Sequence, residues 1–387
     1  MVNIAAGARI LGFLFDKDKS IFPFRWSFDE GIPEKHIPET WVTLVSGDGG
    51  SMGHASAIEP YITLWDDEGK RVGQHWAERT RFLWQGGDLS KYVYKIPNVH
   101  NRDPMVTAKY VMISQFAYDS LICLAAVQVS NGNLSTTWYG DLAAYCGARW
   151  YLSERRVGSA YPKCVWLSAE DEAENGARAI SFHANDMLGT PSKILHYRMD
   201  QEKYLCRSTP RFNYWNNLQP DGTVPFYLPP LQYEIDQETG LEGRDKDPER
   251  AVDRYKWDKH VYIKPSVKGL RSLAPRVGNS TRTNPQRQQG FNRDTSHLLV
   301  TESEGHEASL VCNSTTSYGW DIASLKEKKY CDMTIRKLYD LCSSVYTKNC
   351  FDLERKILIG HGGINSRGEV SSIGVAEKAY KKTSHWK

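Results

Sequence analysis

Apolar positions in this chain come in short runs separated by turn residues. The longest run covers residues 121–129 (LICLAAVQV), and a second one with Trp138 and Tyr139 follows the polar turn Asn131-Gly132-Asn133. An Asn-Gly pair between two apolar runs is typical of a β-hairpin. We therefore predict a hairpin or two neighbouring strands over residues 121–151, with the rest of the chain organised around them.

Similar strand-length runs recur at intervals of about ten residues along the first 235 positions, a spacing typical of an all-β sandwich. They cover residues 41–45, 61–65, 71–76, 82–84, 92–96, 109–113, 164–167 and 179–183. An Asp-Asp-Glu-Gly turn at 66–69 lets residues 71–76 return antiparallel to 61–65. The expected fold class is mainly β, with an antiparallel β-sandwich over residues 1–235.

The composition changes after residue 235. Residues 236–296 are charged, and within them 264–294 hold basic side chains among Ser, Asn, Pro and Gln, which predicts a linker or strap. Residues 297–387 carry short apolar segments and four cysteines, as expected of a small cysteine-rich unit with a C-terminal tail. The alternative is a single α+β domain in which this unit packs onto the sandwich.

Cysteines and sequons bear on the compartment. The chain has 8 cysteines and no C-x-x-C pair, so a metal site is not expected. Their number, with N-x-S/T sequons at Asn133, Asn279 and Asn313, favours a secreted glycoprotein with disulfide bonds over a reduced cytosolic protein with buried thiols. The cysteines are Cys123, Cys146, Cys164, Cys206, Cys312, Cys331, Cys342 and Cys350.

Strand adjacency suggests how the first four cysteines pair. Cys123 and Cys146 lie on the two arms of the predicted hairpin, so we expect a bond between them, which leaves Cys164 with Cys206. The four C-terminal cysteines are expected to pair among themselves, in an order that the sequence leaves open.

Charge and hydropathy exclude some partners. The net charge is only +3 over 387 residues, which gives no global field for nucleic acid. No stretch of 18 apolar residues exists, so no membrane span is expected. Residues 5–15 resemble the apolar part of a signal peptide, but Arg9 interrupts them and a normal secretory signal is not predicted.

Catalytic motifs are weak. Residues 49–53 (GGSMG) match the G-x-S-x-G elbow of serine hydrolases, with Ser51 as nucleophile and His54 beside it, but Pro60 cuts short the helix such an elbow needs. His183 and Asp186 could pair as general base and orienting carboxylate, although a histidine at a strand end is usually structural. No Walker A, dinucleotide-binding or HExxH pattern occurs, so no cofactor is expected.

Aromatic residues are abundant, with 21 Tyr, 12 Trp and 12 Phe. Most are expected in the core or in cross-strand pairs. The remainder could form an exposed platform for a glycan, and Trp138, Tyr139, Trp150 and Tyr151 are the weak candidates for it.

Several stretches resemble an uncharacterised family of mostly secreted, cysteine-containing proteins of filamentous ascomycete fungi. They include EPYITLWDDEGKRVG (59–73), TWYGDLAAYCGARWYLS (137–153), PKCVWLSAEDE (162–172) and, near the C-terminus, SLVCNSTTSYGWDIASLKEKKYCDM (309–333). The family has no established activity, so no catalytic residue is carried over. The resemblance implies a fungal source and an association with secreted, host-interacting proteins, although family members usually begin with a signal peptide.

Three hypotheses of function follow. The preferred one is a non-enzymatic secreted binding or effector-type protein whose partner is a glycan or a host protein. The alternatives are a serine hydrolase that uses Ser51 and a structural or self-assembling protein.

Overall fold

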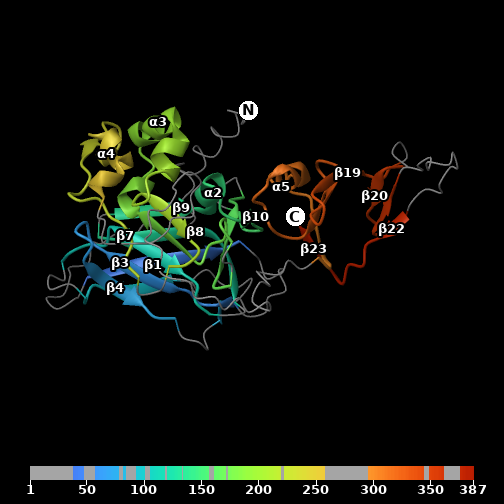
Figure 1. Ribbon diagram of the computed structural model, residues 1–387, viewed down its shortest axis with the longest axis horizontal. Helices are drawn as coiled ribbons and strands as arrows, with labels where there is room; N and C mark the ends of the chain where they lie inside the picture. Colours follow the sequence, from blue (N-terminus) through green and yellow to red (C-terminus); the bar gives the residue numbers. More distant parts are fainter. Residues whose placement is uncertain are drawn as a thin grey trace, which may run out of the picture. The chain divides into compact units, whose positions relative to one another are not determined.

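The computed structural model describes residues 38–47, 57–77, 82–83, 93–100, 105–117, 120–132, 134–156, 161–170, 173–218, 222–257, 295–343, 348–360 and 375–387. The chain divides into two compact units, Met1–Phe291 and Asn292–Lys387 (Figure 1). The predicted basic linker at 264–294 lies outside the described residues, as do Ser51, His54, Asn133 and Asn279.

The predicted hairpin belongs to the first sheet of the N-terminal unit. Its strands pair from Ala126 opposite Tyr139 to Asn131 opposite Leu134, which confirms the prediction. Gly132 at the turn has φ +50°, a conformation that glycine adopts without strain. All pairs in the sheet are antiparallel. The strand order is β10 (Trp150–Tyr151), β11 (Cys164–Ser168), β8 (Leu121–Asn131), β1 (Glu39–Ser46) and β6 (Val93–Pro97), and β9 (Leu134–Tyr139) also pairs with β8.

The second sheet of this unit is also antiparallel. Its order is β13 (Phe212–Trp215), β12 (Ala179–His183), β7 (Tyr110–Ser114), β3 (Tyr61–Trp65) and β4 (Arg71–His75). The predicted return of β4 along β3 is confirmed. Two small antiparallel pairs accompany it, β14 (Tyr233–Ile235) with β15 (Glu242–Asp245) and β2 (Ala57–Ile58) with β5 (Phe82–Leu83).

Short helices connect these strands. They are α2 (Gly140–Tyr145), η3 (Ala184–Met187), α3 (Pro191–Met199), η4 (Glu202–Cys206), α4 (Pro248–Val252) and η5 (Arg254–Lys256). Among the described residues, no helix has the length and apolar character needed to cross a membrane.

Aromatic side chains join the two sheets. Trp138 of β9 is fully buried and stacks on Phe182 of β12 and Phe212 of β13, with ring centroids 6.1 and 5.9 Å apart. Such offset aromatic contacts add to the large apolar area that each ring removes from water. The mainly β, antiparallel character predicted from the sequence is therefore confirmed.

The predicted glycan platform is wrong. Trp138, Tyr139, Trp150 and Tyr151 are exposed by only 0%, 4%, 2% and 0%. Their rings fill the protein interior, so no ligand can stack on them. They were placed at the surface because alternation along a strand does not reveal that both faces of this sheet region are covered.

The expected pairing of the first four cysteines is also wrong, since the bonds join Cys123 to Cys164 and Cys146 to Cys206. Cys146 does not lie on a strand: it follows helix α2, which the sequence reading missed, and this carries it away from β8. Strand β11 pairs with the first part of β8, where it sets Val165 opposite Leu124 and so brings Cys164 within reach of Cys123.

The C-terminal unit is built on one mixed sheet. Its order is β22 (Val375–Glu377), β21 (Ile357–Ile359), β20 (Cys350–Asp352), β19 (Lys337–Leu341), β18 (Lys329–Asp332), β17 (Asp321–Ser324), β16 (His297–Thr301) and β23 (Lys382–Trp386). Strand β16 runs parallel to both β17 and β23. The end of the chain is thus a strand of this sheet rather than a tail.

Covalent bonds and one stacked pair hold this small unit. Cys312 at the end of helix α5 (Ala308–Asn313) is bonded to Cys331 of β18, and Cys342 is bonded to Cys350. The four C-terminal cysteines therefore pair among themselves, as predicted. Tyr330 stacks on Phe351 with ring centroids 3.8 Å apart at the centre of a thin core.

The Cys146–Cys206 bond should be a major stabiliser of the N-terminal unit. It closes a sequence separation of 60 residues, for which the chain-entropy relation gives about 4 kcal/mol. A Cys146→Ala, Cys206→Ala double variant should lose about that much free energy of unfolding in denaturant titrations. Non-reducing peptide mapping should recover a 146–206 link, and recovery of a 123–146 link would contradict the assignment.

Candidate functional site

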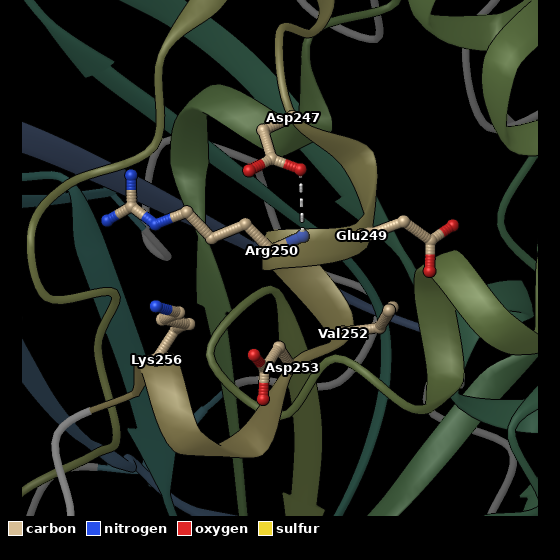
Figure 2. A pocket seen from close by; sticks show the side chains of 6 residues that line it. All are labelled: Asp247, Glu249, Arg250, Val252, Asp253 and Lys256. Carbon is tan, nitrogen blue, oxygen red and sulfur yellow. Dashed lines mark hydrogen bonds between the residues drawn. The ribbon is translucent and has the colours of Figure 1, made fainter.

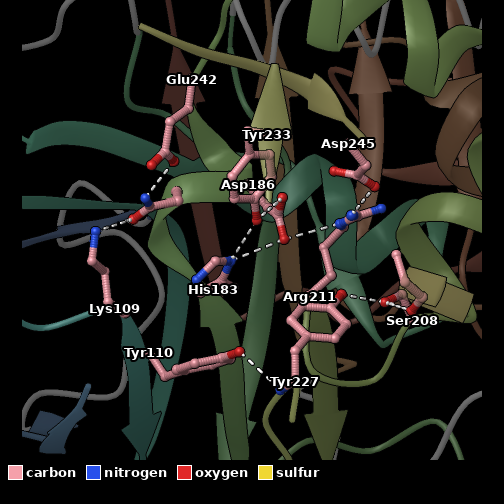
Figure 3. A network of polar contacts seen from close by, with 12 residues as sticks. Lys109, Tyr110, His183, Asp186, Ser208, Arg211, Tyr227, Tyr233, Glu242 and Asp245 are labelled. Atoms are coloured by element: carbon pink, nitrogen blue, oxygen red, sulfur yellow. Dashed lines mark hydrogen bonds and ion pairs between the residues drawn. The ribbon is translucent and has the colours of Figure 1, made fainter. Parts of the chain in front are cut away.

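Polar side chains gather at one end of the five-stranded sheet (Figure 3). Strand β12 ends at His183, which lies opposite Tyr110 at the start of β7. Tyr110 in turn lies opposite Trp65 at the end of β3, and Asp67 follows two residues later. Because neighbouring strands are antiparallel, the end of one strand and the start of the next lie at the same end of the sheet.

His183 contacts two carboxylates. Its Nδ1 lies 3.0 Å from Asp186 Oδ2, and its Nε2 lies 3.4 Å from Asp67 Oδ1. The 3₁₀ helix η3 begins directly after β12, and residues three apart align in such a helix, which brings Asp186 under His183. The Tyr233 hydroxyl completes the group: it donates to Asp186 Oδ1 at 2.9 Å and lies 3.2 Å from His183 Nδ1.

Arg211 is the buried cation of this network. Its Nε lies 3.0 Å from Asp186 Oδ2, and its Nη2 donates to Asp245 Oδ2 at 2.6 Å. All three side chains are 0% exposed. The guanidinium also donates to the Tyr204 carbonyl and lies 4.8 Å from the centroid of the Tyr197 ring. This is a fully desolvated Asp–Arg–Asp triad, an arrangement that is stable only when every member keeps its partners.

The pKa shifts follow from these contacts. Burial alone would raise the pKa of Asp186, but the charge of Arg211 and the hydrogen bond from His183 hold it well below the ordinary value. Burial disfavours the charged form of His183, yet the hydrogen bonds and charges of Asp186 and Asp67 outweigh burial and raise its pKa. Burial lowers the pKa of Lys193, which donates to the Asn185 carbonyl at 2.6 Å. The network therefore stabilises the ionised forms of Asp186 and His183, and burial disfavours the charged form of Lys193.

The arrangement is suited to stability more than to proton transfer. The contact between His183 and Asp186 expected from the sequence is confirmed. A general base, however, must reach a substrate, and the His183 side chain is 2% exposed with Nε2 directed at Asp67. Arg211, Asp245 and Asp67 were missed by the sequence reading because no local motif connects residues so far apart along the chain.

An aromatic cluster lies at the opposite end of the same sheet. Tyr61 at the start of β3 contacts the Trp76 ring edge to face at 5.6 Å and the Phe116 ring at 6.4 Å. Trp76 directly follows β4, Phe116 comes shortly after β7, and the guanidinium of Arg178, just before β12, lies 5.8 Å from the Phe116 centroid. Trp76 is 58% exposed, unlike the four aromatics first considered. The predicted hairpin over 61–76 was the available indication, since it sets Tyr61 beside Trp76.

A cavity of about 470 Å³ lies beside α4 and η5 (Figure 2). Its charged lining is engaged locally: Asp247 accepts from the Arg250 amide and Asp253 from the Tyr255 amide, both as helix caps. The Arg250 guanidinium donates to the carbonyls of Pro229 and Pro230. These side chains stabilise local turns and helix ends, so they do not point together toward a ligand. The lining residues are Asp247, Glu249, Arg250, Val252, Asp253 and Lys256.

Metal ligation has no geometric basis in the part of the chain that the structure describes. No group of three or more His, Cys, Asp or Glu side chains there could hold an ion. All eight cysteines are consumed in disulfides. Of the three sequons, Asn313 is described, and it is exposed at the end of α5.

Another buried acid, Asp141, lies in the first turn of α2. It is 7% exposed, and its Oδ2 accepts from the Lys163 amide at 3.0 Å. Burial raises its pKa to about 6, while the charge of Lys163 only partly offsets this. The Lys163 ammonium instead lies over the Trp150 ring, 4.4 Å from the centroid.

No protein-family model, curated protein or solved structure matches this chain. Function must therefore be argued from the geometry of the two sheet ends.

Replacing Asp186 by Asn should destabilise the N-terminal unit by about 3–5 kcal/mol, because Arg211 and His183 lose a buried counter-charge. Urea unfolding at neutral pH measures this. Asp67→Asn is the matched control: its side chain is 39% exposed, so its loss should cost below about 1 kcal/mol. Equal effects of the two changes would show that the buried triad is not the main constraint.

The Asp141 carboxyl should make stability fall as pH rises. Its folded pKa of about 6 exceeds the ordinary 3.8, so its stabilising contribution is complete below pH 3.8 and is lost as pH rises to about 6. Asp141→Asn removes this dependence, and the variant should exceed the wild type by on the order of 2 kcal/mol at pH 7.5.

The same comparison at pH 4 should give a much smaller difference between variant and wild type, since both side chains are then mostly neutral. Other titrating groups are common to the two proteins and cancel. A difference that is the same at pH 4 and pH 7.5 in chemical unfolding would contradict the assignment.

Proposed function

We propose that this chain is a non-enzymatic, secreted binding protein whose ligand is a glycan, held on the surface formed by Tyr61, Trp76 and Phe116. The observation that carries the proposal is the 58% exposure of Trp76. A large aromatic side chain left in water forfeits the stabilisation that burial would give, so an exposed one next to other aromatics indicates a binding surface.

The cluster is held rigidly enough to serve as a platform. Tyr61 begins β3, Trp76 directly follows β4, and Phe116 lies two residues after β7. The Tyr61 ring is nearly perpendicular to both Trp76 and Phe116, at 84° and 87°. Edge-to-face contacts of this kind fix ring orientation. Sugar rings present apolar C–H faces, which pack on an aromatic surface that does not need to reorganise.

Polar groups next to the cluster can serve the hydroxyls of a sugar. His75 immediately precedes Trp76, its side chain is 20% exposed, and its Nε2 lies 3.3 Å from Glu59 Oε1. Gln74, two residues before Trp76, accepts a hydrogen bond from Arg71 Nη1 at 3.0 Å. Sites for small ligands combine apolar and aromatic side chains with a few precisely placed polar groups, and the surroundings of Trp76 contain both.

Secretion is supported by covalent chemistry. The structure joins all eight cysteines in four bonds, and such pairing persists in oxidising compartments. The exposed Asn313 sequon is accessible to glycosylation. With the resemblance to secreted fungal proteins, these features support an effector-type role toward a host. We further propose that the two larger sheets of the N-terminal unit, which Trp138 links, form a β-sandwich.

The binding surface can be tested on a glycan array. Trp76→Ala should reduce binding about fivefold or more, because loss of a stacking partner costs about 1 kcal/mol or more. Tyr61→Ala should weaken binding less, since Tyr61 acts mainly by holding the Trp76 ring. Thermal unfolding of Trp76→Ala should stay close to that of the wild type because the side chain is largely exposed.

Tyr255→Ala is the matched control, as Tyr255 is 82% exposed and belongs to η5 rather than to the sheet end. Its binding should equal that of the wild type. Unchanged binding by the Trp76 variant would remove this surface from consideration. Labelling of Ser51 by a fluorophosphonate probe would support the hydrolase alternative instead.

A further inference from the structure

We propose that Lys109 and Asn185 form an intramolecular isopeptide bond, with Glu242 as the proton carrier. The three side chains come from separate elements at the polar end of the five-stranded sheet: Lys109 precedes β7, Asn185 belongs to η3, and Glu242 begins β15. Lys109 and Glu242 can be followed in Figure 3 on either side of the residue they share. The proposal does not depend on glycan binding.

The oxygen and the nitrogen of the Asn185 side-chain amide each contact one of the other two reacting groups. Lys109 Nζ donates to Asn185 Oδ1 at 3.4 Å, and Asn185 Nδ2 donates to Glu242 Oε2 at 2.5 Å. A C=O bond is about 1.2 Å long, so the amine lies within about 4.6 Å of the Cγ carbon. Attack requires a separation of about 3–3.5 Å, which a small side-chain rotation can supply.

The backbone holds the reacting groups in register. The Lys109 amide donates to the Trp65 carbonyl at 2.7 Å, and the Lys109 carbonyl accepts from the Ala184 amide at 2.7 Å. Ala184 is therefore hydrogen-bonded to Lys109, and the next residue, Asn185, is 4% exposed. On the opposite side, Thr190 donates to the Glu242 carbonyl at 3.1 Å. Holding reactants together in this way removes most of the entropic barrier to their reaction.

The step balances without an oxidant or a cofactor. The half-buried Lys109 ammonium first gives a proton to water, and the free amine attacks Asn185 Cγ to form the new C–N bond. Glu242 takes the second proton from the attacking nitrogen and delivers it to Nδ2. The Cγ–Nδ2 bond then breaks and ammonia leaves, so that one amide replaces another.

Two neighbouring charges bear on this chemistry. The carboxylate of Asp67 lies close enough to Lys109 that the lysine charge, after the hydrogen bond and charge of His183, helps to lower the Asp67 pKa against the effect of burial. Lys193 also contacts Asn185, but its Nζ donates to the backbone carbonyl at 2.6 Å rather than to the side-chain amide. Lys109 is therefore the lysine placed to attack Cγ.

Mass spectrometry of the full-length protein tests the bond. After reduction and enzymatic removal of N-glycans, which converts each glycosylated Asn to Asp, the chain should be lighter by one ammonia than the sequence mass corrected for that conversion. Trypsin should fail to cut after Lys109 and should release a branched peptide in which residues 103–149 are joined to residues 179–193. Full sequence mass together with linear peptides 103–109 and 179–193 would overturn the proposal, as would a link mapped to Lys193.

Two variants test the assigned roles. Lys109→Met and Glu242→Gln should each restore the sequence mass of the variant and abolish the branched peptide. Glu234→Gln is the matched control, because Glu234 belongs to the same hairpin but pairs with Arg244 at 2.6 Å, and its link should form as in the wild type. A complete link in Glu242→Gln would show that Glu242 is not the proton carrier and contradict the mechanism.

Discussion

The N-terminal unit depends on the charge of one buried side chain, Arg211. This residue lies immediately before β13, and its two carboxylate partners come from elsewhere: Asp186 follows β12 and Asp245 ends β15. A guanidinium without solvent is tolerated only with full compensation. The triad therefore requires the sheet end, η3 and the β14–β15 hairpin to come together at once. His183, Tyr197 and Tyr233 provide the other hydrogen bonds to the Asp186 carboxylate.

The same sheet presents very different chemistry at its two ends. One end is closed by the buried ionic network, where a change in one group affects all the others. At the other end, Trp76 remains largely in water beside Tyr61. The two proposals follow from this contrast. The polar end fixes the positions of the strands and of Lys109 and Asn185, and the aromatic end remains available to a ligand. The exposed end needs no rearrangement to bind, because its strands are already held.

The candidate site could be predicted from the sequence only where its residues are close along the chain. His183 and Asp186 were found because they are three residues apart, and β3 and β4 because only five residues, with a turn signal among them, separate the two strands. Arg211 and Asp245 gave no such indication, since neither has a local motif and the sequence does not show which strands become neighbours. The proposed Trp138 and Trp150 platform failed for the same reason. The sequence around a tryptophan in a strand is the same whether the sheet face that it occupies is covered or exposed to solvent.

The amino-acid sequence by itself determined the local features of this protein. Apolar runs of strand length gave the strands, Asn131-Gly132 gave the hairpin turn, and the cysteine content gave a disulfide-bonded chain whose last four cysteines pair together. Only the tertiary structure decided which cysteines of the N-terminal unit meet, which aromatics stay in water, and which charges share the interior. These depend on the order of strands in a sheet, and that order is set by packing between distant segments rather than by any periodicity along the chain.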